Sequence, residues 1–81
     1  MSQAIISNLA QKIASDIIHQ PGRSISADEA LLSSGLIDSF SLVDLSLMVE
    51  DEYGVHIDDT ELNPETFDTL SQLAALIVSR Q

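Results

Sequence analysis

Residues 38–54 read DSFSLVDLSLMVEDEYG, and this stretch predicts the central helix of a small, all-helical domain. Asp38 is a favourable N-cap, because its side chain can accept a hydrogen bond from a backbone N–H of the first helical turn. Ser39 then falls in that first turn. Gly54 can adopt the left-handed conformation that ends many helices, so we expect the helix to run from residue 39 to about residue 52.

This helix carries two apolar stripes, although a helix that lies on a bundle needs only one. At about 100° per residue, the first stripe spans roughly 60° and suits a hydrophobic core; it consists of Leu42, Leu45 and Val49. The second stripe lies on nearly the opposite side and also spans roughly 60°; it consists of Phe40, Val43 and Leu47.

The second stripe has acidic residues along both edges, with Glu50 on one side and Asp44 and Asp51 on the other. An apolar strip framed by like charges is typical of a surface that docks protein partners. The alternative is burial between the first helix and the connection that follows it. This alternative stays open for Phe40 in particular, because apolar residues precede it in sequence.

Regular patterns also flank the central helix on its N-terminal side. Apolar residues recur at helical spacing from Ile5 to Ile17, which predicts a helix over about residues 3–18, and Pro21-Gly22 ends any continuation. The connection over residues 21–38 is unusually long for so small a domain. We expect it to pack against the core, because it contains Leu31, Leu32, Leu36 and Ile37. Ser26 and Glu29 have capping-box spacing, which is compatible with a turn of helix over residues 26–32.

Two further capping-box pairs follow the central helix. Asp58 with Glu61 predicts a single helical turn, and Thr69 with Gln72 predicts a last helix through about Ser79. Its apolar face consists of Leu70, Leu73, Ala74 and Ile77. The predicted fold is therefore an all-α four-helix bundle with three longer helices, one short helix and a long first loop. We expect one domain over residues 1–81, and a monomer.

The charge balance argues against nucleic acids as partners. The chain has thirteen acidic residues against three Lys and Arg, a formal net charge of −10, and no Lys or Arg lies between Arg23 and Arg80. Such a surface repels nucleic acids and favours rapid encounter with basic protein patches. Simple solubility is the alternative explanation of the acidic surface.

Composition also argues against an enzyme, a metal site and a membrane span. There is no cysteine, the two histidines are far apart in sequence, and the acids of residues 58–68 lack the pattern of a calcium loop. No apolar run approaches the roughly 18 residues of a membrane span, and no secretion signal is recognisable. We therefore expect a cytoplasmic protein. No His or Lys lies close to Ser39 in sequence, so this serine lacks the base that an activated nucleophile needs.

At residues 35–40 the sequence GLIDSF resembles the phosphopantetheine attachment motif of acyl carrier proteins and related peptidyl carrier domains. The resemblance continues through residues 42–45 and 50–57, which look like the second helix of this family and its exit. It includes residues 67–70, which look like the entry to the last helix. In all it covers roughly residues 28–78.

The resemblance implies a carrier that is itself no enzyme. A phosphopantetheinyl transferase would move 4'-phosphopantetheine from coenzyme A onto Ser39, and Asp38 would help the transferase to recognise the site. Acyl groups would then travel as thioesters on the arm between loading and processing enzymes, which have basic patches. The partner-binding residues would be Phe40, Val43, Asp44, Leu47, Glu50 and Asp51.

Two departures from the family's pattern leave the cargo open. Carriers of fatty-acid synthesis often have an acid at the position of Ser41, and they usually have Gly-Ala before the Asp-Ser pair. The form in residues 33–39 looks more like free-standing carriers of dedicated pathways, including those that load amino acids. An aminoacyl or peptidyl carrier is therefore one alternative, and an unmodified acidic interaction module is another.

Overall fold

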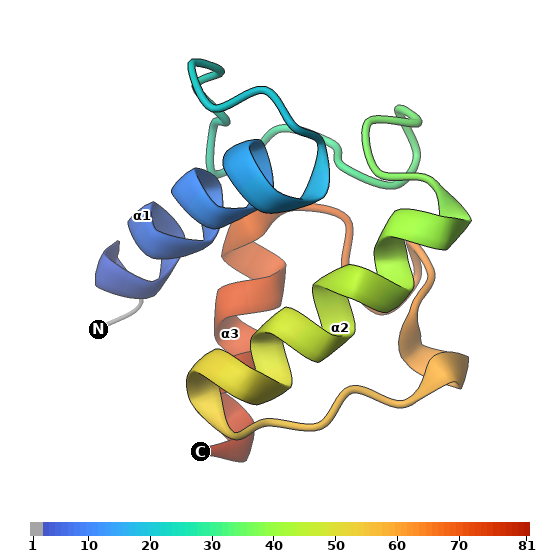
Figure 1. Ribbon diagram of the computed structural model, residues 1–81. Coiled ribbons are helices and arrows are strands. Elements are labelled where there is room, and N and C mark those ends of the chain that lie inside the picture. Colours follow the sequence, from blue (N-terminus) through green and yellow to red (C-terminus); the bar gives the residue numbers. More distant parts are fainter. Residues whose placement is uncertain (1–2) are drawn as a thin grey trace.

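The computed structural model describes residues 3–81, and this part of the chain is helical and contains no strand (Figure 1). The first helix, α1, runs over Gln3–Lys12 and continues as a π-helix, η1, over Ile13–Ile17. The second helix, α2, runs over Ser39–Tyr53. A 3₁₀ turn, η2, covers Asp59–Glu61, and the last helix, α3, covers Leu70–Arg80. The prediction of three longer helices, one short helix and a long first loop is confirmed.

The first helix has the predicted length but changes its hydrogen bonding near the end. The Ile18 N–H donates to the carbonyl of Ile13, five residues back, at 2.9 Å, and the Gln20 N–H donates to the carbonyl of Ala14 at 2.6 Å. Between them His19 has a φ of 57°, in the left-handed region. Histidine enters this region more readily than most residues. The exposed His19 thus makes the turn that glycine makes at many other helix ends.

The core is apolar throughout, and Phe67 is its only aromatic side chain among the described residues. One apolar stripe of each of the three longer helices faces this core, and α1 packs against α3 while α2 packs against η1. Figure 1 shows α3 passing behind α2, with the long connection along the top of the view from η1 to the start of α2. The fully buried residues of the helices include Leu9, Ile13, Leu45, Val49, Leu70, Leu73, Ala74 and Ile77.

No helix forms over residues 26–32, where a hydrogen bond from the Glu29 N–H to the Ser26 carbonyl, at 3.2 Å, closes a single turn. The Glu29 carboxylate does accept a hydrogen bond from the Ser26 N–H, at 3.4 Å, but it also pairs with Arg23 at 2.6 Å. The Leu31 N–H donates to the carbonyl of Asp68 at 2.6 Å instead of to a carbonyl of its own segment. A contact with a distant part of the chain therefore replaces the local helical hydrogen bond. The expectation that this connection packs down is confirmed, because Leu31 and Ile37 are buried.

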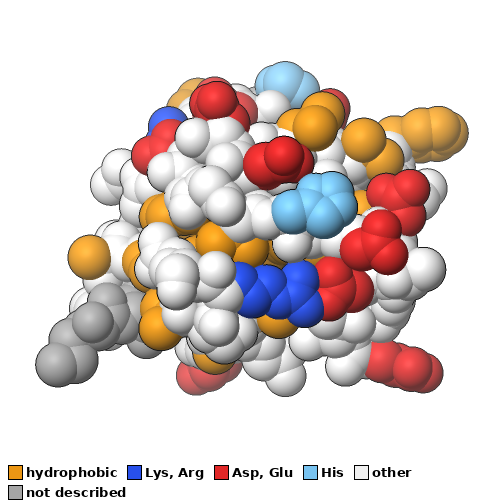
Figure 2. Space-filling view, turned by 90° about the horizontal axis from the view of Figure 1, so that it is seen from below, with side chains coloured by type: hydrophobic (Ala, Val, Ile, Leu, Met, Phe, Trp, Pro, Cys, Tyr) orange, Lys and Arg blue, Asp and Glu red, His pale blue; other side chains and the backbone are white. Residues whose placement is uncertain are grey.

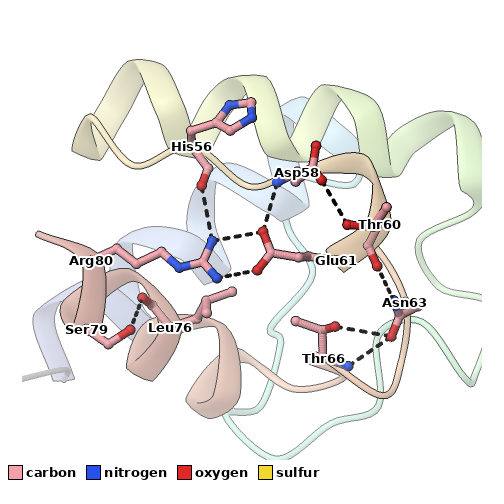
Figure 3. A network of polar contacts seen from close by, with 9 residues as sticks. All are labelled: His56, Asp58, Thr60, Glu61, Asn63, Thr66, Leu76, Ser79 and Arg80. Carbon is pink, nitrogen blue, oxygen red and sulfur yellow. Dashed lines mark hydrogen bonds and ion pairs between the residues drawn. The ribbon is translucent and has the colours of Figure 1, made fainter.

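A polar clasp joins the C-terminal end of α3 to η2 and to the segment before it (Figure 3). The Arg80 guanidinium donates to the backbone carbonyl of His56 at 3.2 Å and binds both carboxylate oxygens of Glu61. The Glu61 carboxylate also accepts from the Asp58 N–H at 3.0 Å, as the capping box predicts. Hydrogen bonds from Arg80, and then from Asp58, lower the pKa of Glu61 from 4.5 to about 2.

Replacing Glu61 by glutamine is expected to make stability less sensitive to acid. Because the folded pKa of Glu61 lies below its unfolded value of 4.5, the clasp contributes its full stability above about pH 4.5 and loses it as the pH falls towards 2. The Glu61→Gln variant should melt below the wild type at pH 7, and the difference should shrink towards pH 2. Thermal melts followed by circular dichroism at both pH values test this. A difference that is independent of pH would contradict it.

Candidate functional site

Ser39 is the first residue of α2 and is exposed. Its neighbour Asp38 is the N-cap, as predicted, because the Asp38 carboxylate accepts a hydrogen bond from the Ser41 N–H at 2.8 Å. The same contact with Ser41 is the main cause that lowers the pKa of Asp38. The cap therefore holds the start of α2 in place without involving the Ser39 side chain. The positive end of the helix dipole lies at this position, and it favours a negatively charged group.

Lys12 and His56 are candidates for a base that could activate Ser39, but both lie near the C-terminal end of α2, whereas Ser39 is at its N-terminal end. Lys12 pairs with Glu52 at 3.4 Å, and the His56 ring lies 3.3 Å from Glu50. At 1.5 Å of rise per residue, these glutamates are roughly 16–20 Å along the helix from Ser39. Neither Lys12 nor His56 can therefore activate the Ser39 hydroxyl from these positions.

The chain approaches Ser39 through a closed turn. Gly35 has a φ of 82°, which favours glycine, and its N–H donates to the carbonyl of Leu32 at 3.1 Å. The N–H of Ile37 donates to the carbonyl of Leu31 at 3.0 Å, and both side chains are buried. The two ends of the turn are thus held together immediately before Asp38.

The two stripes of α2 separate as the sequence indicated. The first stripe is buried, with Leu42 at 9% exposure and Leu45 and Val49 at 0%. The second stripe lies at the surface, with Phe40 at 84%, Val43 at 49% and Leu47 at 59% exposure. Burial of Phe40 under the connection, the alternative left open above, is therefore wrong. The acids beside this stripe are exposed as well: Asp44, Glu50 and Asp51.

The surface is strongly acidic because acidic residues far outnumber Lys and Arg, and each Lys and Arg is engaged with a glutamate. Lys12 pairs with Glu52, Arg23 with Glu29 and Arg80 with Glu61. Figure 2 shows the result on one face, where acidic side chains are widely spread and basic ones are few. With thirteen acids in the chain and three paired in this way, ten remain without a Lys or Arg partner.

One comparison with known proteins decides what kind of chain this is. A family model described as a phosphopantetheine attachment site matches residues 8–77, which include all of α2, half of α1 and most of α3. The chain belongs to the phosphopantetheine-binding family. Carriers of this family hold 4'-phosphopantetheine covalently and are not catalytic, so this protein is a phosphopantetheine carrier and not an enzyme. A search of curated proteins finds no match to this carrier.

The exposed serine fits the group that the family carries. A covalent arm needs a hydroxyl that a second enzyme can reach, and Ser39 presents one at a capped helix end.

Residues 3–81 of the carrier contain no group of three or more His, Asp or Glu side chains that could hold a metal ion. None of the helices in the same span combines the length and the apolar character that crossing a bilayer requires.

Sequence reasoning missed one residue that contacts the connection leading to this site, namely Asp68. Residues 67–70 were interpreted only as the entry to the last helix, yet the Asp68 side chain contacts the connection that leads to Ser39. An acid immediately before the N-cap Thr69 was the available signal, but its partners are 35 and 36 residues away in sequence. No local pattern indicates contacts over that distance.

Proposed function

We propose that this chain is an acyl carrier protein whose phosphopantetheine arm is attached to Ser39 and holds acyl groups as thioesters on its terminal thiol. The observation that carries this proposal is the position of Ser39. It is exposed, it begins a helix that Asp38 caps, and it lies in the segment that resembles the attachment motif. We further propose that residues 1–81 form a single carrier domain, and that it acts as a cytoplasmic monomer.

Attachment of the arm requires a separate transferase. The Ser39 oxygen would form a bond to the phosphorus on the pantetheine side of the pyrophosphate in coenzyme A. The pyrophosphate bond would break, the adenosine bisphosphate half would leave, and the hydroxyl proton would pass to a base of the transferase. Because Lys12 and His56 are held at the far end of α2, the carrier does not supply that base from these residues. The new phosphodiester would sit at the N-terminus of α2, where the dipole favours its charge.

The exposed face of α2 is the proposed docking surface for the transferase and for enzymes that load and process the cargo. Its apolar centre consists of Phe40, Val43 and Leu47, and its acidic rim of Asp44, Glu50 and Asp51. Apolar contacts at the centre would contribute affinity, while the acids would steer basic partner patches to the correct face. Asp38, one residue before Ser39, would contribute to recognition by the transferase.

The second candidate is an aminoacyl or peptidyl carrier of a dedicated pathway. Leu36-Ile37 before the Asp-Ser pair, and Ser41 in place of an acid, favour this candidate. Both candidates use the same arm on the same serine and differ only in the enzyme that loads the thiol. The unmodified interaction module is disfavoured, because carriers of the chain's family hold the prosthetic group covalently.

Incubation with coenzyme A and a phosphopantetheinyl transferase of broad specificity tests the proposal. Intact-mass spectrometry should find one phosphopantetheine per chain, and fragmentation should place it on Ser39. The loaded carrier is then offered fatty acids with an acyl-adenylating ligase, and amino acids with an amino-acid-activating enzyme, to decide between the two candidates. No added arm, or an arm on another serine, would overturn the proposal.

A further inference from the structure

The Asp68 side chain forms hydrogen bonds with the connection that leads to Ser39. One carboxylate oxygen accepts hydrogen bonds from the Leu32 N–H at 2.8 Å and from the Ser33 N–H at 2.9 Å. The other accepts from the Ser33 hydroxyl at 2.6 Å. The backbone carbonyl of Asp68 accepts from the Leu31 N–H at 2.6 Å. Three successive residues of the connection are thus bound to one acid.

Asp68 is itself held by the start of α3. Its N–H donates to the Gln72 side-chain oxygen at 2.7 Å, and the same oxygen accepts from the Thr69 N–H in the capping box of α3. On its N-terminal side Phe67 is fully buried. The carboxylate therefore projects from a fixed point of the fold. Its contacts with Ser33 are the main cause that lowers the pKa of Asp68, so the group is ionised at neutral pH.

Residues 31–33, which Asp68 binds, are linked to Ser39 by a short series of contacts. Leu31 and Ile37 are joined by a backbone hydrogen bond, and the turn between them closes at Gly35. Ile37 is buried and lies one residue before Asp38, the cap of α2. The beginnings of α2 and α3 are therefore connected through the segment that Asp68 holds.

We propose that Asp68 is a positioning residue, which keeps the approach to Ser39 in the conformation that the transferase recognises. This inference rests on the proposed attachment of phosphopantetheine at Ser39. Without the carboxylate, the connection would populate several conformations, and only a fraction of the molecules would be ready to bind. The apparent affinity for a partner falls in proportion to that fraction. Loss of Asp68 therefore raises the KM of the transferase for the carrier, while kcat stays nearly unchanged once the complex has formed.

Steady-state transfer of phosphopantetheine from coenzyme A is measured for the wild type, Asp68→Asn and Glu61→Gln. The Asp68→Asn substitution keeps the size of the side chain but removes its charge and one acceptor oxygen. For this variant we expect KM to rise about 10-fold, on the scale of one hydrogen bond to a charged group, with kcat within about two-fold. Glu61→Gln is the matched control, because it also converts a hydrogen-bonded carboxylate to an amide, but in the clasp at Arg80. Its KM should stay within about two-fold of the wild type.

Amide hydrogen exchange provides a readout that is independent of activity. In Asp68→Asn the amides of Leu32 and Ser33 should exchange faster, while those in the middle of α2 stay protected. If this variant does not fold, Ser33→Ala replaces it, because that change removes only the hydroxyl contact at 2.6 Å. For Ser33→Ala we expect KM to rise about three-fold.

Three outcomes would overturn the positioning role of Asp68. The first is an unchanged KM in a folded Asp68→Asn variant whose Leu32 and Ser33 amides exchange faster, and the second is that these amides stay protected in this variant. The third is that KM rises equally in Glu61→Gln. Where Ser33→Ala stands in for an unfolded Asp68→Asn, an unchanged KM overturns the role in the same way. A wild-type chain that takes no arm on Ser39 is a different result, because it refutes the proposed function itself.

Discussion

The Ser39→Ala variant is expected to accept no phosphopantetheine, which is a complete loss relative to one arm per chain in the wild type. The arm requires a hydroxyl, and this substitution removes the one at the start of α2. The fold should survive, because the helix is capped by Asp38 and Ser39 is exposed and not part of the core. Alanine is also the better helix former. Intact-mass spectrometry measures the loss, and circular dichroism verifies that the variant is folded.

Ser41→Ala is the matched control for this loss. Ser41 is a second serine in the same helical turn, and its backbone N–H, which alanine retains, is the donor that Asp38 accepts from. We expect full modification of Ser41→Ala under conditions in which Ser39→Ala stays unmodified. An arm found on Ser39→Ala would show that Ser39 is not the attachment point. An arm lost from a folded Ser41→Ala would show that the loss is not specific to the Ser39 hydroxyl.

Leu45→Ala is expected to lower the free energy of unfolding by about 2–5 kcal/mol, which is the usual cost of removing a leucine from a core. The Leu45 side chain has 0% exposure and lies in the buried stripe of α2. Small domains have total stabilities of only about 5–15 kcal/mol, so this loss could unfold a large part of the population. Urea denaturation followed by circular dichroism measures it. A loss well below about 1 kcal/mol would mean that Leu45 is less tightly packed than the structure indicates.

Leu47→Ala is the same substitution on the opposite face of α2, and we expect a different result. Leu47 is 59% exposed, so its loss should change the free energy of unfolding by no more than about 0.5 kcal/mol. If the exposed stripe docks enzymes, kcat/KM for transfer of the arm should fall about 10-fold, in the range for interface residues that matter. An unchanged kcat/KM, with stability also unchanged, would remove Leu47 from the docking surface.

Much of α2 could be predicted from the sequence, because its determinants are local. Asp38 and Gly54 mark its ends through contacts within one turn, and both assignments are confirmed. The alternation of Leu45 and Leu47 between core and surface follows from the helical period alone. The same is true of the capping boxes at η2 and α3, whose partners are three residues apart.

The sequence left open which of the apolar residues near the start of α2 would be covered. Phe40 is the most exposed of the large apolar side chains within residues 3–81, while Ile37, three residues earlier, is buried. Composition does not distinguish these two residues. Their fates depend on the path of the connection, which turns at Gly35 and brings Ile37 back to Leu31.

By itself, the sequence determined the helices, the caps of α2 and α3, the two apolar stripes of α2 and the resemblance that the family match confirms, because these features depend on residues close together along the chain. Only the tertiary structure decided the path of residues 21–38, the clasp between Arg80 and Glu61, and the hydrogen bonds between Asp68 and Ser33. Arg80 and Glu61 are 19 positions apart in the sequence, and Asp68 and Ser33 are 35 positions apart. Such pairs are neighbours only in the packed fold, because hydrophobic burial holds the distant segments together and gives the polar groups partners that no local pattern specifies.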